Sequence, residues 1–191
     1  MARTGLDYLV FSPITAENSN AAPTYGQGFV IGRAVRAAIT ENRYDAKLYG
    51  DDHIAEAYNG VRDCNVEIET TEITEATMVK LGLRKAVTSG QQTVYRMTDE
   101  PTPYGGLGYA EPLMRFGVMK YRATWLYKVQ LGMGGWEAQT KGENLTYGTE
   151  SMTGTALPLP VDATGANSCL DQAVFDTLAE AETWLNNLAG I

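Results

Sequence analysis

Residues 62–71 carry the feature that most limits what this chain can fold into, a strict alternation of apolar and polar side chains. Cys64, Val66 and Ile68 fall on one face of such a segment. The other face is polar and carries Asp63, Asn65, Glu67 and Glu69. A period of two predicts a β-strand with one packed face and one solvated face.

A short helix is predicted directly after this strand, over residues 74–82. Thr74 is a good N-cap, because its hydroxyl can accept a hydrogen bond from an amide that the first helical turn leaves without a partner. Met78 and Leu81 share the side that we expect to be buried, and Gly82 is suited to end the helix in the left-handed conformation. Two turns are too few to be stable alone, so we expect this helix to lie on a sheet.

The longest strand pattern runs over residues 115–131. Its apolar face carries Met119, Tyr121, Ala123, Trp125, Tyr127, Val129 and Leu131. Its open face is basic, with Lys120, Arg122 and Lys128. Residues 28–41 fit a strand or a helical stripe, and a strand is favoured because Gly28 and Gly32 weaken a helix. Three prolines and three glycines predict a loop over residues 99–112, with Gly105, Gly106 and Gly108 as turn residues.

These patterns, together with 20 Gly and 7 Pro, predict a mainly β fold with short helices, of the α+β class. We expect a β-sandwich or barrel-like sheet pair flanked by a helix. Residues 1–27 are expected to form an N-terminal arm or edge strand, so that a chain without residues 1–12 still folds. Residues 28–160 are expected to form the β domain, with a long acidic loop over 41–58. Residues 161–191 read as a linker and a helix, which Thr177 and Glu180 begin with capping-box spacing.

The net charge of −8 argues against sequence-independent nucleic-acid binding, which depends on neutralising phosphates with Lys and Arg. Nearly all of this negative charge lies in residues 41–75, which contain ten acidic residues and three basic ones. Residues 115–128, in contrast, hold four basic residues and no acid. Complementary surfaces of this kind favour head-to-tail association of copies. Neutralisation within one copy is the alternative.

No catalytic constellation is present in the sequence, and we expect no enzyme activity, metal or cofactor. His53 is the only histidine, so neither a Ser-His-Asp system nor a site with two histidines can be assembled without it. Cys64 and Cys169 lack metal-ligand or CxxC spacing, so no disulfide framework is expected. No apolar run approaches the roughly 20 residues that span a bilayer, and no cleavage site follows the N-terminus. We therefore expect a soluble, unsecreted protein without membrane insertion.

The order of these segments resembles a known family. AAITENRYDAKLYGDDHIAEAYNG and VRDCNVEIETTEITEATMVKLGL read as strand, acidic loop, strand and short helix. PTPYGGLGYAEP and YRATWLYKVQL add a loop and a long strand, and TKGENLTYGTESMTGTALPL adds a closing hairpin strand. Over residues 28–157 the chain resembles the major tail proteins, or tail tube proteins, of long-tailed, non-contractile bacteriophages.

The resemblance implies a structural virion protein that is assembled in the host cytoplasm. Its copies would form hexameric rings that stack into the tail tube. Its partners would be itself, the tape measure protein and the tail-end proteins, and DNA would pass through without specific binding. The residues expected to contact other subunits or rings are Tyr44, Lys47, Leu48, Tyr49, Asp51, Asp52, His53 and Glu56. The acids Asp63, Glu67 and Glu69 would face the lumen or a partner.

Two alternatives remain open at this point. One is a monomeric β-sandwich that binds a ligand such as carbohydrate, with Trp125, Trp136 and nearby tyrosines as its platform. The other is the tube protein of a contractile tail or of a phage-derived particle.

Overall fold

The computed structural model describes residues 2–3, 5–19, 21–51, 53–135, 148–161 and 167–191. Strands make up 60% of it and two helices make up 11%, which confirms the expected mainly β class. The first eight strands are β1 (Ala2–Arg3), β2 (Asp7–Ala16), β3 (Thr24–Tyr25), β4 (Phe29–Gly32), β5 (Ala34–Arg43), β6 (Ala46–Gly50), β7 (His53–Tyr58) and β8 (Val61–Thr70). The remaining elements are α1 (Glu75–Lys80), β9 (Lys85–Ser89), β10 (Gln92–Arg96), β11 (Tyr104–Arg115), β12 (Val118–Met133), β13 (Glu150–Ala156), β14 (Leu159–Pro160), β15 (Asn167–Ser168), β16 (Leu170–Phe175) and α2 (Leu178–Ala189).

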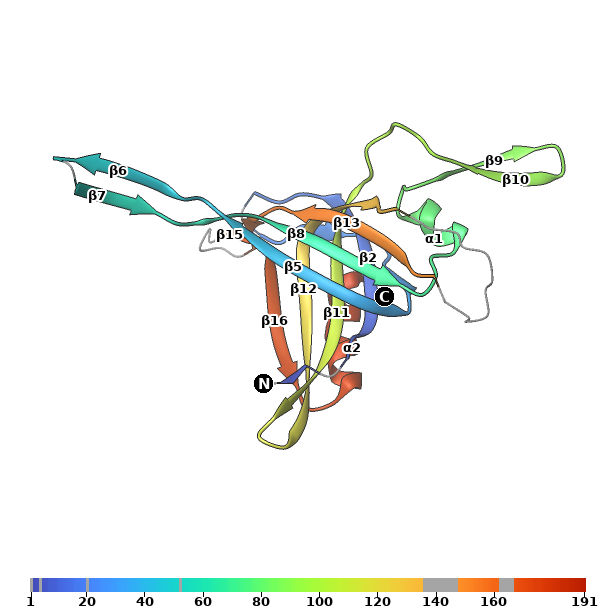
Figure 1. Cartoon of the computed structure of the whole chain (residues 1–191). Coiled ribbons are helices and arrows are strands. Elements are labelled where there is room, and N and C mark those ends of the chain that lie inside the picture. Colours follow the sequence, from blue (N-terminus) through green and yellow to red (C-terminus); the bar gives the residue numbers. More distant parts are fainter. Residues whose placement is uncertain (1, 4, 20, 52, 136–147, 162–166) are drawn as a thin grey trace, which may run out of the picture.

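One large antiparallel sheet organises the molecule (Figure 1), with the strand order β3-β2-β11-β12-β13-β8-β5. Beside this path β4 pairs with β2, β1 with β11 and β16 with β12. Only Arg33 separates β4 from β5, although β4 pairs with β2 and β5 pairs with β8. The chain therefore leads from one end of the sheet back to the other, so the sheet curls around an apolar core.

Strand β12 serves two parts of the sheet. Its residues 121–126 pair with β16, whereas residues 129–133 pair with β13. Between them the register against β11 shifts, so Leu126 faces Leu107 while Val129 faces Gly105. Because of this irregularity, Trp125 and Val129 face opposite sides of the sheet although they are four residues apart. Trp125 packs under α2, and Val129 packs in the core on the other side. The predicted single apolar face along residues 119–131 is therefore wrong, because a bulge reverses the alternation.

Two apolar cores lie on the two sides of the sheet. The first core joins β2, β8, β11, β12 and β13, and Leu9, Phe11, Ile68, Leu107 and Met152 are among its fully buried members. The second core lies where α2 covers β2, β11 and β12, around Trp125 and Leu185. The helix thus flanks the sheet, as the sequence predicted.

The glycine-rich segment 104–115 is a central strand, and the predicted loop with turn glycines is wrong there. A Cβ on Gly105 would lie 2.2 Å from the Phe11 ring, and a Cβ on Gly106 would lie 2.2 Å from the Trp125 ring. The glycines leave room for the two aromatic rings, which belong to the cores on opposite sides of the sheet. Glycines that suggest a turn in the sequence are thus needed here because the aromatic rings approach the strand backbone closely.

Strand β2 also differs from the prediction, because residues 7–16 are neither an arm nor an edge. They pair with β11 on one side and with β3 and β4 on the other. Leu9 and Val10 are fully buried, one in each core. The run of apolar residues without alternation is the pattern of a strand that is covered on both faces.

Both predicted helices are confirmed with their caps. The Thr74 hydroxyl accepts from the Thr77 amide at 3.3 Å, and Gly82 follows α1 with φ +73°. Thr177 and Glu180 form the expected capping box of α2, and Gly190 ends it with φ +70°. Local chemistry fixes these ends, which is why the sequence alone was sufficient to place them.

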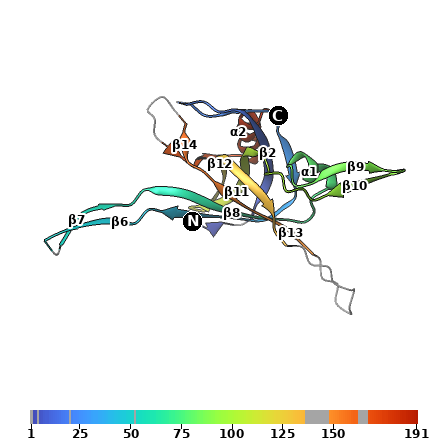
Figure 2. The ribbon, with the colours of Figure 1, turned by 90° about the horizontal axis from the view of Figure 1, so that it is seen from above.

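Two hairpins project beyond the sheet on opposite sides, one made of β6 and β7 and one of β9 and β10 (Figures 1 and 2). The first replaces the long acidic loop that was expected over residues 41–58. It is exposed on both faces and therefore lacks the apolar alternation by which a half-buried strand is recognised. The second hairpin follows α1 and pairs residues 85–89 with residues 92–96.

Stability should fall in alkaline solution, because burial raises the pKa of the Cys169 thiol to about 12. Burial also raises the pKa values of Cys64 and of the Tyr25 hydroxyl. In the unfolded chain the Cys169 thiol loses its proton near pH 9.0, whereas the folded chain holds that proton to about pH 12. Between these values the unfolded state binds fewer protons, so each such group lowers the unfolding free energy by up to about 1.4 kcal/mol per pH unit.

Urea unfolding at pH 8, 9, 10 and 11 measures this slope. The matched variant Cys169→Ala should lose stability less steeply above pH 9.0 than the natural chain. Equal slopes in the two proteins would contradict the assignment.

Candidate assembly surfaces

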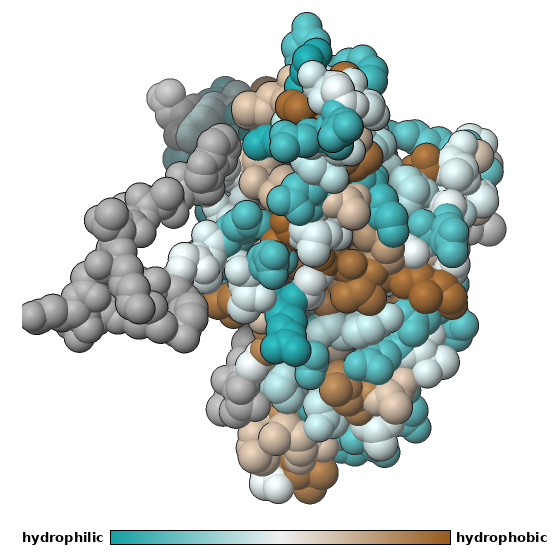
Figure 3. Space-filling model, turned by 90° about the vertical axis from the view of Figure 1, so that its right-hand side faces the viewer, coloured by the Kyte–Doolittle hydropathy of each residue, from teal (hydrophilic) through white to brown (hydrophobic). Residues whose placement is uncertain are grey.

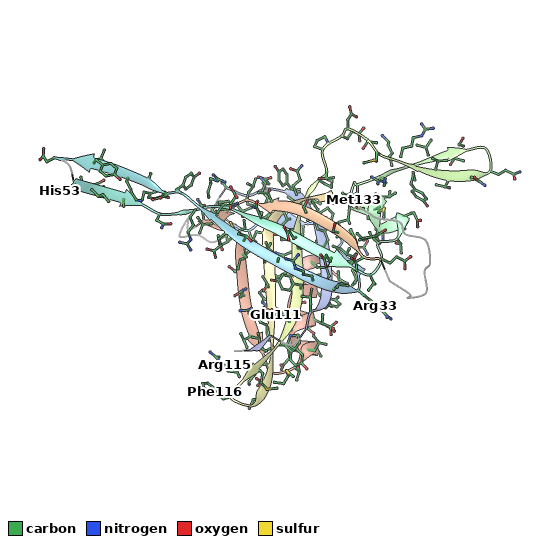
Figure 4. The ribbon with its side chains drawn as sticks, viewed as in Figure 1. Arg33, His53, Glu111, Arg115, Phe116 and Met133 are labelled. Atoms are coloured by element: carbon green, nitrogen blue, oxygen red, sulfur yellow. The ribbon has the colours of Figure 1, made fainter. Side chains whose placement is uncertain are left out.

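The hairpin arm, defined as the described residues 44–51 and 53–58, continues β5 and β8 away from the sheet. His53 lies near its tip (Figure 4). Gly50 pairs with His53, and Asp51 in the turn has φ +50°, a left-handed conformation that aspartate tolerates better than most residues. The arm thus closes next to Asp51, after the Gly50–His53 pair.

The base of the arm is fixed to the body. The Tyr44 amide donates to the Gly60 carbonyl at 2.8 Å, and the Tyr44 and Tyr58 rings lie 6.0 Å apart. The direction of the arm follows from β5 and β8, which are paired over nearly their whole length. The arm is therefore held at a defined place on the body.

The arm carries large apolar side chains that contact solvent. Leu48 is 61% exposed, Tyr49 64% and Ile54 56%. An isolated two-stranded hairpin is marginally stable in water, and apolar groups on it favour a covering partner. The arm therefore has the composition of a contact surface.

The structure brings the predicted contact residues together on this one element. Tyr44, Lys47, Leu48, Tyr49, Asp51, His53 and Glu56 all lie on the arm and are all exposed. Asp52 lies outside the described residues. Lys47 and Asp45 form an exposed ion pair at 3.4 Å, so the charge of the arm is partly neutralised within the arm.

The second surface is the polar face, formed by the outward side chains of β5, β8 and β13. Asp63, Glu67 and Glu69 lie together on it, because Cys64, Val66 and Ile68 turn toward the core. Apart from Arg36, their neighbours on this face are alanine, amide or hydroxyl side chains: Ala38, Thr40, Asn42, Asn65, Ser151, Thr153 and Thr155. The predicted alternation of this strand is thus confirmed, and its polar side forms a continuous sheet surface.

The acids on the polar face are paired with arginines. Arg36 lies 3.0 Å from Glu67 and 3.8 Å from Glu69. Asp63 accepts hydrogen bonds from Asn42 and Arg62, and these bonds hold its pKa below the usual value. Three carboxylates thus face two guanidinium groups, so the face is weakly acidic and rich in hydrogen-bonding groups.

The basic side chains of β12 have partners within the same copy. Lys120 pairs with Asp176, Arg122 with Glu111, and Lys128 lies 2.6 Å from Glu17. These acids come from outside residues 41–75. The suggested head-to-tail attraction between a basic strand and an acidic segment is therefore replaced by neutralisation within the copy.

Among the described residues no group of three or more His, Cys, Asp or Glu side chains is placed to hold a metal ion. In the same part of the chain, neither helix has the length and apolar character that crossing a membrane requires. Trp125 is fully buried, so it cannot act as a binding platform, and Trp136 lies outside the described residues.

Sequence reasoning missed one exposed feature, the turn between β11 and β12. Residues 115–131 had been expected as one strand, but β12 begins at Val118 after a turn of Phe116 and Gly117. The Phe-Gly dipeptide was the available signal, because glycine there has φ +80°.

Comparison with known proteins adds no assignment. The sequence matches no protein-family model, and it has no significant match among curated proteins.

Proposed function

We propose that this chain is the subunit of a phage tail tube, which assembles as stacked hexameric rings around a channel for DNA. The hairpin arm is the observation that carries the proposal. Residues 44–49, 51 and 53–58 are all exposed, and the arm presents Leu48, Tyr49 and Ile54 to solvent beyond β5 and β8. A neighbouring copy that covers these side chains would remove apolar surface from water.

The polar face supports the same function, because its chemistry suits the wall of a channel. Glu67 and Glu69 flank Arg36, and the remaining groups are mostly hydroxyls and amides. Tight binding of a nucleic acid requires several Lys or Arg side chains that neutralise phosphates. A face with more carboxylates than guanidinium groups would let DNA slide past.

The competing function of a monomeric carbohydrate-binding module is not supported by Trp125, the one tryptophan of its expected platform within the described residues. Sugar-binding surfaces present aromatic rings to solvent, whereas Trp125 is fully buried and Tyr127 is 6% exposed. Both rings belong to the core under α2.

Negative-stain electron microscopy of the concentrated protein, combined with light scattering over a dilution series, tests the proposal. We expect rings or hollow tubes at high concentration and dissociation on dilution. A monodisperse monomer at every concentration would contradict self-assembly of this chain.

A further inference from the structure

The turn between β11 and β12 presents an aromatic side chain in an unfavourable backbone conformation. Phe116 is 100% exposed and has φ +50°, a left-handed region that bulky residues seldom adopt. Two-residue turns of this kind favour Asn-Gly, so a phenylalanine here is not explained by the turn itself. Strain of this sort is found where a residue has a function beyond folding.

The residues around Phe116 extend its apolar surface. Met114 is 38% exposed, Val118 54% and Met119 40%. We call these three residues together with Phe116 the apolar tip. It occupies the lower end of the molecule, where the space-filling view shows apolar colours (Figure 3).

A shallow hollow of about 180 Å³ lies near the other end of β12, and we call it the upper hollow. Its lining includes Gly82, Leu83, Arg84, Met97, Glu100 and Met133. Met97 is 67% exposed, so part of this apolar lining contacts solvent. Phe116 and Met133 lie at opposite ends of the molecule (Figure 4).

The positions of the apolar tip and the upper hollow determine how copies joined through them would repeat along one axis. The apolar tip and Met133 mark opposite ends of the hairpin that β11 and β12 form. A 12-residue strand such as β11 spans about 40 Å, at about 3.4 Å per residue. Joining a tip to a hollow displaces each copy along the hairpin axis. A head-to-tail contact that displaces copies along one axis, without a rotation that closes into a ring, extends into a filament.

We propose that Phe116 of one copy inserts into the upper hollow of the copy in the next ring. This inference rests on the proposed tube and assigns its axial contact. The hairpin arm projects sideways from the β11–β12 hairpin (Figures 1 and 2), so it contacts neighbours within a ring. Lateral and axial contacts thereby fall on different elements.

The chemistry of the two surfaces is complementary. Methionine side chains adapt to irregular shapes and make favourable sulfur–aromatic contacts, which suits Met97 and Met133 as neighbours of a phenyl ring. Arg84 adds a guanidinium group, which can lie over a ring face. Arg115 beside Phe116 brings a positive charge toward Glu100, whose side chain is 69% exposed and lies 3.5 Å from Lys85 of its own copy.

The variant Phe116→Asn tests the contact without a loss of folding, because Asn-Gly is the preferred sequence for this turn. We expect thermal stability equal to or above that of the natural chain. We also expect rings to persist while the concentration needed for tube growth rises at least about tenfold, the effect of losing one well-packed aromatic contact. Val94→Asn is the matched control, because Val94 is an exposed strand residue at 40% that lies outside both surfaces.

The partner surface is identified by placing the photo-crosslinker benzoylphenylalanine at position 116 in assembled tubes. Crosslinks to residues 82–84, 97–100 or 132–133 of another copy are expected. If the Phe116→Asn variant forms tubes as readily as the natural chain, the axial contact alone is overturned. Crosslinks that fall on the hairpin arm would overturn it as well. If the natural chain forms neither rings nor tubes, both this inference and the proposed function are overturned.

Discussion

A chain that lacks residues 1–12 is expected not to fold, in contrast to what the sequence patterns suggest for this segment. The deletion removes Leu9, Val10 and Phe11, each at most 1% exposed, from strand β2. Burying three such side chains contributes about 5–9 kcal/mol, whereas the whole stability of a domain is about 5–15 kcal/mol. The loss also leaves β11 without a partner along one edge.

Near-ultraviolet circular dichroism and urea unfolding measure this effect. The truncated chain should show no fixed aromatic signal and no cooperative transition. Deletion of residues 1–5 is the control, because it ends before β2 begins at Asp7 and should leave a cooperative transition. A Δ1–12 chain with an unchanged urea midpoint would mean that β2 is dispensable.

Replacing Leu48, Tyr49 and Ile54 with serine is expected to abolish assembly and leave the fold intact. These side chains are more than half exposed and lie outside both cores, so the subunit does not depend on them for packing. Truncating a hot-spot residue of an interface costs about 2 kcal/mol or more, and we expect the three side chains together to contribute more than about 3 kcal/mol. A total loss above about 3 kcal/mol raises the concentration needed for assembly at least about 100-fold.

Light scattering and electron microscopy report assembly, while thermal unfolding of the dilute protein reports the fold. The control is a chain with serine at Ala46, Ala55 and Ala57, which places the same number of substitutions on the same arm but removes little apolar surface. We expect the control to assemble normally. A triple variant that assembles as well as this control would show that the arm is not the contact surface.

The sequence predicted those elements whose cause is local. The alternation around Cys64, Val66 and Ile68 placed β8 and its polar face correctly, because a strand with one buried face has a period of two. Thr74 and Thr177 placed the starts of both helices, because capping depends on residues only a few positions apart. The sequence also indicated the acids of the polar face and residues of the arm as candidate contact residues, but not how they are arranged.

Tertiary structure decided what depends on distant residues. Gly105 and Gly106 lie in a central strand because the Phe11 and Trp125 rings, far away in sequence, fill the space beside them. Strands β6 and β7 form a hairpin because β5 and β8, from which they continue, pair with each other. No periodic pattern within the segment predicts that pairing. The partners of Lys120, Arg122 and Lys128 also come from remote segments. Periodicity and capping are properties of neighbouring residues, whereas pairing and close packing are set by which segments the whole sheet brings together.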